Sequence, residues 1–343
     1  MRLLVLGGTA WLGGLLVDAA CAKGHDVTCL ARGTSGIAPR GAALARADRA
    51  LPGAYEQVLG QRWDCAIDVS RQPGQVGSAA SVLAKVARAF VFVSSASVYA
   101  DHSRPGGDES GALLAPLEGD VMEDMNSYGQ AKVACEQQVL AAFGEDRSLI
   151  VRAGLIGGPG DASDRTGYWP LRFARAAATA RAVLVPDASR QPTQVIDARD
   201  LAHWIIDRAC AGDAGTFNAC GETIGFREHI EIARHVGGHR GVVVSAGSDW
   251  LLRQGVTPWM GPKSLPLWLP APDYAGFAAR DSSAAEKAGL SRRSLEATLH
   301  DTLAWELSRV PSPMPRRAGL SDEDEAFLLG IANVRELPTC CGP

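Results

Sequence analysis

The first half of the chain alternates short apolar runs with stretches that have the length and composition of helices. We expect strands at Arg2–Leu6, Asp26–Leu30, Ala43–Ala47, Cys65–Val69, Ala89–Ser94 and Ser148–Arg152. We expect helices between them at Trp11–Lys23, Gln75–Ala87 and Ser127–Phe143. Short, continuous apolar runs are typical of parallel strands that are buried on both faces. The sequence therefore predicts an α/β protein with a doubly wound parallel sheet of the Rossmann type.

The pattern becomes less regular after about Gly154, where a loop rich in glycine follows the last of these strands. We predict a dinucleotide-binding domain at residues 1–154, with return elements near 193–220. Residues 155–192 and 221–343 are predicted to form a smaller, irregular α/β substrate domain and a C-terminal tail. Ligands of doubly wound sheets bind at the carboxyl ends of the strands, so we expect the second domain to close over that edge.

Composition excludes several classes of protein. The formal net charge of -4 argues against a general nucleic-acid-binding surface. No run of 18 apolar residues is present, so we expect no membrane span and a cytoplasmic location. The eight cysteines lack zinc-ribbon spacing, which favours a reducing compartment. His229, His235 and His239 lack a completing carboxylate or thiol, so we expect structural or surface histidines and no metal.

A glycine-rich turn directly follows the first expected strand and opens the first expected helix. Gly7 permits a tight turn, the small Ala10 lets backbone approach a pyrophosphate, and Gly13 permits close packing of helix on strand. The helix N-terminus offers N–H groups to phosphates. The predicted cofactor-binding residues of this turn are Gly7, Thr9, Ala10, Trp11, Leu12 and Gly13. The alternative is a tight turn without a ligand.

The end of the second expected strand bears on the choice between NAD and NADP. It carries no carboxylate for a ribose 2′-hydroxyl, whereas Arg32 can pair with a 2′-phosphate, assisted by Thr34 and Ser35. We therefore expect NADP(H), with NAD as a possibility, and a solvated arginine is the alternative. Asp48 is a candidate acceptor for the adenine amino group or an ordinary turn residue.

Two further segments carry hydroxyl and ammonium groups whose positions along the chain are typical of a catalytic site. Tyr128 and Lys132 lie four residues apart at the start of a helix and therefore share one face. A free phenol ionises only near about pH 10, and a neighbouring ammonium favours the phenolate. Such a tyrosine can exchange a proton with an alcohol or carbonyl oxygen during hydride transfer. Ser95 directly follows the fifth expected strand, where its hydroxyl can hold the same oxygen. Tyr-x-x-x-Lys alone also arises by chance.

The chain resembles the extended short-chain dehydrogenase/reductase family, which is also called the NAD-dependent epimerase/dehydratase family. The resemblance is carried by three motifs, which are the glycine turn, the Ser-Ser-x-x-Val-Tyr stretch that ends at Tyr99, and the Tyr-x-x-x-Lys helix. The resemblance covers most of residues 1–220 and includes Val195–Ala202, where we expect Asp200 to cap a helix. It implies catalytic roles for Ser95, Tyr128 and Lys132, contact of the last two with the cofactor, and a homodimer.

Departures from the family pattern narrow the reaction. Dehydratases of the family carry an acid pair where this chain has Ala96 and Ser97, so we do not expect dehydration. The Arg32-Gly33 ending differs from epimerases that retain NAD. We therefore expect NADP(H)-dependent reduction of a ketone, or its reverse, on a small polar substrate such as a sugar derivative. A nucleotide-sugar epimerase with tightly bound NAD is the alternative, and a non-catalytic dinucleotide- or RNA-binding protein is a third.

Substrate contacts are expected chiefly on a basic helix at Tyr168–Arg181. An arginine there can clamp a phosphate or carboxylate, and an aromatic ring can stack on a substrate ring. The candidates are Ser97, Tyr168, Trp169, Arg172 and Gln194. The alternative is an amphipathic helix with its basic face in water.

Overall fold

The protein is described by a computed structural model that covers residues 1–270, 272–309 and 316–332. The chain divides into two compact units. The first comprises residues 1–154, 198–221 and 280–292, and the second comprises 155–197, 222–279 and the residues from 293 onward. The expected C-terminal tail, with Cys340 and Cys341, lies outside the described residues.

A seven-stranded parallel sheet forms the centre of the first unit. Its order is β10-β6-β5-β4-β1-β2-β3. The strands are β1 (Arg2–Leu6), β2 (Asp26–Ala31), β3 (Ala43–Arg46), β4 (Trp63–Asp68), β5 (Ala87–Ser95), β6 (Ser148–Ala153) and β10 (Gly215–Ala219). Six strands were expected, and β10 adds a seventh by pairing in parallel with β6. The doubly wound α/β fold is thereby confirmed.

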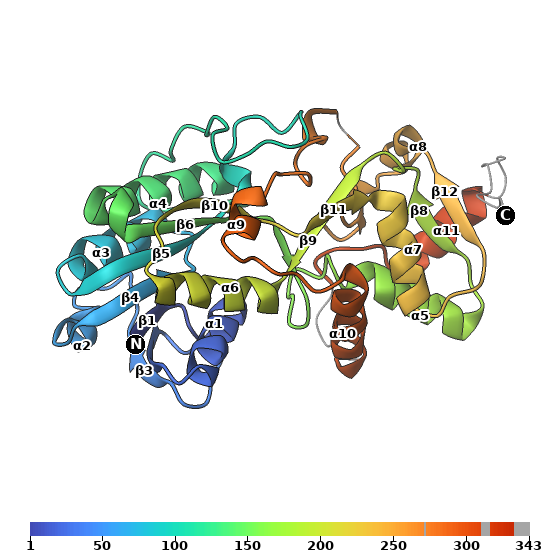
Figure 1. Cartoon of the computed structure of the whole chain (residues 1–343). Coiled ribbons are helices and arrows are strands. Elements are labelled where there is room, and N and C mark those ends of the chain that lie inside the picture. Colours follow the sequence, from blue (N-terminus) through green and yellow to red (C-terminus); the bar gives the residue numbers. More distant parts are fainter. Residues whose placement is uncertain (271, 310–315, 333–343) are drawn as a thin grey trace. The chain divides into compact units, whose positions relative to one another are not determined.

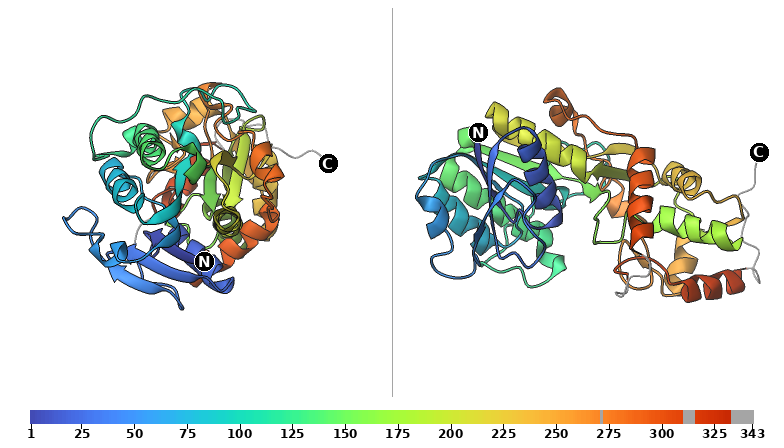
Figure 2. Two further views of the ribbon diagram at one scale, coloured as in Figure 1. Left: turned by 60° about the vertical axis from the view of Figure 1, so that its left-hand side comes forward. Right: turned by 90° about the horizontal axis from the view of Figure 1, so that it is seen from below.

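Helices cover both faces of this sheet. In Figure 1, α3 (Pro73–Leu83) and α4 (Tyr128–Phe143) lie on one face, and α1 (Trp11–Ala22) and α6 (Ala198–Ala211) lie on the other. Figure 2 shows α1 and α6 side by side from a second direction. The shorter elements are α2 (Glu56–Leu59), α9 (Ser283–Lys287), η1 (Ala96–Val98), η2 (Met125–Ser127) and η3 (Glu145–Arg147).

Several helix limits differ from the sequence-based expectation by one to four residues. Helix α3 ends at Leu83, earlier than the expected Ala87, because Ala87 already begins β5. Helix α6 begins at Ala198, so Asp200 lies in its first turn and is not its cap.

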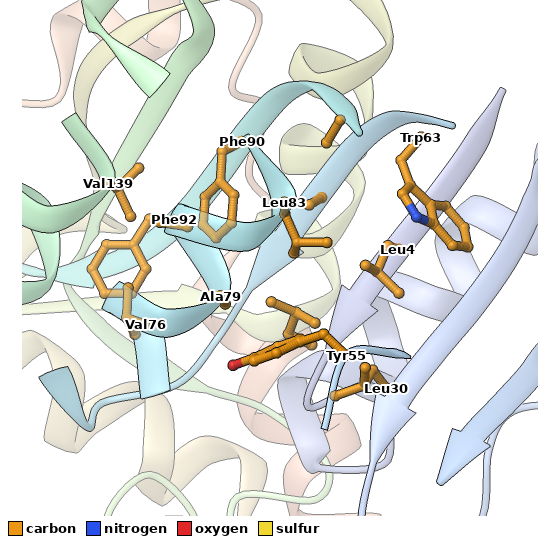
Figure 3. Packing of buried hydrophobic residues seen from close by; sticks show 14 of the residues in the cluster. Leu4, Leu30, Tyr55, Trp63, Val76, Ala79, Leu83, Phe90, Phe92 and Val139 are labelled. Carbon is orange, nitrogen blue, oxygen red and sulfur yellow. The ribbon is translucent and has the colours of Figure 1, made fainter. Parts of the chain in front are cut away.

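The core beneath α3 and α4 follows from the alternation of side chains along the strands. Successive side chains of a strand point to opposite faces, so Leu4, Phe90 and Phe92 reach the same face of the sheet. Figure 3 shows them packed with Leu83 of α3 and Val139 of α4. All five side chains are fully buried, which holds α3 and α4 firmly on the sheet.

The second unit is built from smaller sheets and more helices. A three-stranded sheet has the order β11-β9-β7, and β12 pairs with β8 and β13 with β14. The strands are β7 (Leu155–Gly157), β8 (Val183–Pro186), β9 (Pro192–Asp197), β11 (Glu222–Gly225), β12 (Val243–Ala246), β13 (Thr257–Pro258) and β14 (Ser264–Leu265). The helices are α5 (Tyr168–Thr179), α7 (Phe226–Val236), α8 (Ser248–Arg253), η4 (Pro272–Tyr274), α10 (Leu295–Ser308) and α11 (Asp322–Ala332).

The segment 193–220, expected to return to the first domain, is shared between the units. Strand β9 lies in the second unit, whereas α6 and β10 lie in the first. Among the described residues, no helix is long and apolar enough to cross a membrane.

Candidate active site

The sheet order reverses next to β1, which pairs with β2 on one side and with β4 on the other. In doubly wound sheets, the carboxyl edge at such a reversal is where ligands bind. The glycine turn leaves β1 at this edge, and Ser95 ends β5 at the same edge because all seven strands are parallel. The fold therefore places the two predicted segments along one rim of the first unit.

The glycine turn has the backbone that a phosphate-binding turn requires. Gly7 has a φ of +86°, a conformation that favours glycine. A Cβ on Gly13 would lie 2.2 Å from the carbonyl oxygen of Gly7, so α1 packs directly on the turn. Helix α1 begins at Trp11 and has no acidic side chain in its first turn. Its N-terminal N–H groups and partial positive charge therefore suit an anion.

A hollow of about 130 Å³ opens beside this turn. Its lining includes seven of the predicted cofactor-binding residues, namely Gly7, Thr9, Ala10, Arg32, Thr34, Ser35 and Asp48. Trp11, Leu12 and Gly13 follow in the first turn of α1. The structure thus brings the glycine turn together with the ends of β2 and β3 around one hollow.

Two guanidinium groups lie near the end of β2. The side chain of Arg32 is 61% exposed, and its Nη1 is 3.9 Å from Oδ2 of Asp48. A Cβ on Gly33 would lie 3.4 Å from Nη2 of Arg46. Sequence reasoning missed Arg46, which comes beside the β2 end only through the pairing of Ala31 with Arg46. The strand register is the signal that would have found it.

One member of a buried ion pair lines the hollow. Arg49, which lines the hollow, donates from Nη2 to Oδ2 of Asp68 at 2.6 Å, and both side chains are buried. Burial lowers the pKa of the Arg49 guanidinium, but the Asp68 carboxylate outweighs this and raises it above its ordinary value. Sequence reasoning did not identify this pair either, because Asp68 reads as the end of an apolar strand.

The Tyr128–Lys132 pair lies at the start of α4, as predicted. Nζ of Lys132 lies 6.0 Å from the centre of the Tyr128 ring. The ammonium is buried and donates to the carbonyl oxygens of Ser70 at 2.6 Å and Val93 at 2.7 Å. It also lies 4.6 Å from the centre of the Phe92 ring. A buried ammonium needs such acceptors, and here they fix its position near the phenol.

Ser95 is the last residue of β5 and caps the short helix η1, which contains Ser97. The Ser95 hydroxyl accepts the N–H of Ser97 at 3.1 Å and donates to the Ser97 hydroxyl at 3.2 Å. A Cβ on Gly129 would lie only 2.3 Å from the carbonyl oxygen of Ser97. The first turn of α4, which carries Tyr128, therefore packs directly on the turn that carries the two serines. This approach requires glycine at position 129.

Helix α4 is fixed on the sheet by a second buried ion pair. Nη2 of Arg152 on β6 donates to Oε2 of Glu136 at 2.8 Å, and the Ser94 hydroxyl donates to Oε1 of Glu136 at 2.5 Å. Arg152 also donates to the Tyr99 hydroxyl at 3.2 Å. These contacts join α4 to β5 and β6 one turn beyond Lys132.

The expected substrate residues of the second unit are all buried, but their surroundings differ. Trp169 is fully buried and donates its indole N–H to the carbonyl of Pro266 at 2.9 Å. Tyr168 lies in the same core cluster, and burial raises the pKa of its phenol. Arg172 pairs with Glu325 and Asp322. The proposed contacts of these three residues with substrate find no support, because core packing and ion pairing already occupy their side chains.

Gln194 lies in a different setting. It lines a hollow that also contains Thr193, Trp259 and Phe277, and its Nε2 donates to the Thr223 hydroxyl at 2.9 Å. It stays a candidate for substrate contact.

The three histidines weighed as metal ligands, all in the second unit, are dispersed. His229 is fully buried and its Nδ1 lies 3.3 Å from the Thr193 hydroxyl oxygen. His239 contacts the carbonyl of Arg181, and His235 is exposed beside Glu296. Within residues 1–270, 272–309 and 316–332, no three His, Cys, Asp or Glu side chains are grouped to hold a metal ion.

Solved structures with the same fold span nearly the whole chain. A putative epimerase from Burkholderia cenocepacia J2315 is 20% identical, with 89% of this chain and 98% of that chain covered and a TM-score of 0.66. UDP-N-acetylglucosamine 4-epimerase from Methanobrevibacter ruminantium M1, in complex with UDP-N-acetylmuramic acid, is 18% identical, with coverages of 90% and 99% and a TM-score of 0.65. The Bordetella bronchiseptica enzyme WbmG in complex with NAD is 16% identical, with coverages of 90% and 94% and a TM-score of 0.60.

At these identities, the likeness to solved structures concerns the fold. No curated protein matches the chain. The sequence model of the NAD dependent epimerase/dehydratase family, in contrast, matches residues 3–220, which is more than half of the chain and contains the glycine turn, Ser95, Tyr128 and Lys132. The chain therefore belongs to the NAD-dependent epimerase/dehydratase family.

Proposed function

We propose that this protein is an NAD(P)-dependent enzyme that moves a hydride and a proton at a secondary alcohol carbon, with Tyr128 as the general acid and base. The observation that carries the proposal is the position of the Lys132 ammonium, which is buried 6.0 Å from the Tyr128 ring at the rim where the glycine turn and Ser95 also lie.

Each side chain has a separate part in the proposed reaction. A bound dinucleotide would supply the nicotinamide carbon that exchanges hydride with the substrate. Tyr128 as phenolate takes the proton of the substrate hydroxyl when the alcohol is oxidised, and returns it when the ketone is reduced. The Lys132 ammonium stabilises the phenolate, since an opposite charge nearby favours the ionised form. The Ser95 hydroxyl holds the substrate oxygen beside Tyr128.

Epimerisation of a nucleotide-linked sugar is the first use we propose for this chemistry. The UDP-N-acetylglucosamine 4-epimerase from M. ruminantium shares the fold over 90% of this chain, and WbmG has been solved with NAD and UDP. Ala96 and Ser97 provide no carboxyl group that could expel water, which disfavours dehydration. These likenesses support the epimerase alternative better than the ketone reductase expected from the sequence.

Net reduction of a ketone by NADPH is the second candidate, and one observation favours it. The end of β2 carries no carboxylate, whereas Arg32 and Arg46 both lie near Gly33. Two guanidinium groups suit a 2′-phosphate. A reductase that releases its cofactor would use this preference for NADPH.

One product assay tests both candidates. The protein is incubated with NAD⁺ or NADP⁺ and a panel of UDP-hexoses and UDP-N-acetylhexosamines, and the sugars are analysed by proton NMR. In parallel, NADPH consumption is measured with keto-sugars and other polar ketones. An epimerase converts sugar without net change in the dinucleotide, and a reductase consumes NADPH in proportion to product. Binding of dinucleotide without any conversion that requires Tyr128 would contradict both.

A further inference from the structure

The buried pair Arg49–Asp68 is connected both to the dinucleotide hollow, which Arg49 lines, and through Ser70 to the Lys132 ammonium. Arg49 follows Asp48 in the loop after β3, and Asp68 is the last residue of β4. The guanidinium makes a two-point contact with the carboxylate, from Nη1 to Oδ1 at 3.0 Å and from Nη2 to Oδ2 at 2.6 Å. The guanidinium also donates to the Tyr55 hydroxyl at 3.2 Å and to the Gln75 carbonyl at 2.6 Å.

Both members of the pair hold Ser70. Oδ1 of Asp68 accepts the N–H of Ser70 at 2.8 Å, and Nη1 of Arg49 donates to the Ser70 hydroxyl at 2.5 Å. Ser70 lies in the loop between β4 and α3, where neither the sheet nor a helix fixes the backbone. The ion pair therefore sets the direction in which the Ser70 carbonyl points.

The Ser70 carbonyl is one of the two acceptors of the Lys132 ammonium, at 2.6 Å. The other acceptor, the Val93 carbonyl, belongs to β5 and is held by the sheet. An ammonium has three N–H donors, so two contacts with fixed carbonyls leave one donor for a ligand. Without a fixed Ser70 carbonyl, the ammonium keeps one anchor and can swing away from the phenol.

We propose that Arg49 and Asp68 are positioning residues for Lys132, acting through the carbonyl of Ser70. The proposal rests on the proposed function of Tyr128 and Lys132 and adds two residues to it. It also links the lining of the dinucleotide hollow, which includes Arg49 and Ser70, to the acid–base pair. A pair that only stabilised the fold would have no influence on ionisation of the Tyr128 phenol in folded protein.

The test replaces both charges at once, with Arg49→Met and Asp68→Leu in one protein. Removing one partner would leave an unpaired buried charge, whereas an apolar pair of similar volume is often tolerated. The matched control is Arg316→Met with Glu306→Leu, which removes a two-point ion pair from the second unit. Circular dichroism and thermal unfolding establish that each protein is folded.

The primary measurement is the ultraviolet absorbance of tyrosinate as pH is raised, with saturating NADP⁺ present. The step that belongs to Tyr128 is the one missing from the same preparation carrying Tyr128→Phe. In the Arg49/Asp68 variant, we expect this step to move to higher pH, because the Lys132 ammonium that favours the phenolate is no longer held beside it. In the control, we expect the step to stay where it is in the unaltered protein.

A second variant keeps the proposal testable if the paired variant does not fold. Ser70→Ala retains both buried charges and removes only the hydroxyl that Arg49 contacts. A smaller movement of the tyrosinate step in the same direction supports the proposal. An unmoved step in folded Ser70→Ala protein overturns it.

The outcomes separate this inference from the proposed function. If the tyrosinate step of Tyr128 moves in the Arg49/Asp68 variant but the unaltered protein converts no substrate, the positioning role stands and the proposed reaction fails. If the unaltered protein is active and the step and the pH profile of kcat are the same in the folded Arg49/Asp68 variant, the reaction stands and the positioning role is wrong.

Discussion

Substitution of Gly129 by alanine tests how closely α4 must approach the serine turn. A Cβ at this position would lie 2.3 Å from the Ser97 carbonyl oxygen and 2.7 Å from Cδ1 of Leu114. The leucine side chain can rotate, but the carbonyl belongs to backbone and cannot. Cβ contacts under 3.0 Å essentially never occur, so helix and turn must separate by at least about 0.7 Å.

This separation falls between Tyr128 and the turn that carries Ser95. A misplacement of about 1 Å in an active site can lower the rate about 100-fold, so we expect kcat of Gly129→Ala to fall by an amount on the order of 100-fold. We expect the dissociation constant for the dinucleotide to change little, because the glycine turn and the ends of β2 and β3 are untouched. The assay is steady-state turnover of the substrate found in the sugar and ketone screen, with dinucleotide binding followed by fluorescence.

Gly330→Ala is the matched control. A Cβ on Gly330 of α11 meets nothing within 4 Å, so this variant gains helix propensity, worth about 1 kcal/mol, without a clash. We expect unchanged kcat and equal or higher thermal stability. If Gly129→Ala behaved in the same way as Gly330→Ala, the close packing of α4 on η1 would have no catalytic importance.

Two other predictions concern cofactor choice and pH. Replacing both Arg32 and Arg46 by aspartate should raise the ratio of NAD affinity to NADP affinity by at least about tenfold, since two charges that attract the 2′-phosphate become repulsive. An unchanged ratio in fluorescence titrations would show that neither arginine contacts the 2′-phosphate. Burial of His229 lowers its pKa to about 4, below the value of about 6.5 in the unfolded chain. Above about pH 6.5, the histidine is neutral in both states, and as the pH falls towards about pH 4, protonation of the unfolded chain lowers the free energy of unfolding. Between about pH 7 and pH 5, this histidine should account for about 2 kcal/mol of lost unfolding free energy. Urea unfolding of His229→Leu at both pH values should show a correspondingly smaller loss, and an equal loss in both proteins would assign it to other groups.

The parts of the fold that local patterns determine were predictable from the sequence. Strand β1 has the predicted limits, and α4 ends at the predicted Phe143, because apolar runs and helical spacing depend on neighbouring residues alone. Strand β10 lies within the segment that was expected to return to the first domain, but its place beside β6 was not predicted. Edge pairing of that kind depends on how the chain returns to the sheet.

In the candidate site as well, local motifs were predictable from the sequence and contacts between distant segments were not. Ser95, Tyr128 and Lys132 follow from short motifs, whereas Arg46 and the Arg49–Asp68 pair reach the site through strand register and loop packing. The substrate candidates on α5 were chosen for their chemistry, but burial of Trp169 could not be read from that chemistry. An aromatic residue on an amphipathic helix packs in a core as readily as it binds a ligand.

The most direct test of the central claim is the absorbance of reduced nicotinamide in single-turnover mixing of protein, oxidised dinucleotide and the identified alcohol substrate. We predict that the unaltered protein forms reduced dinucleotide, and that Tyr128→Phe binds the dinucleotide with similar affinity but forms none. Formation of reduced dinucleotide at the same rate in the Tyr128→Phe protein would contradict the assignment of Tyr128 as the group that moves the proton.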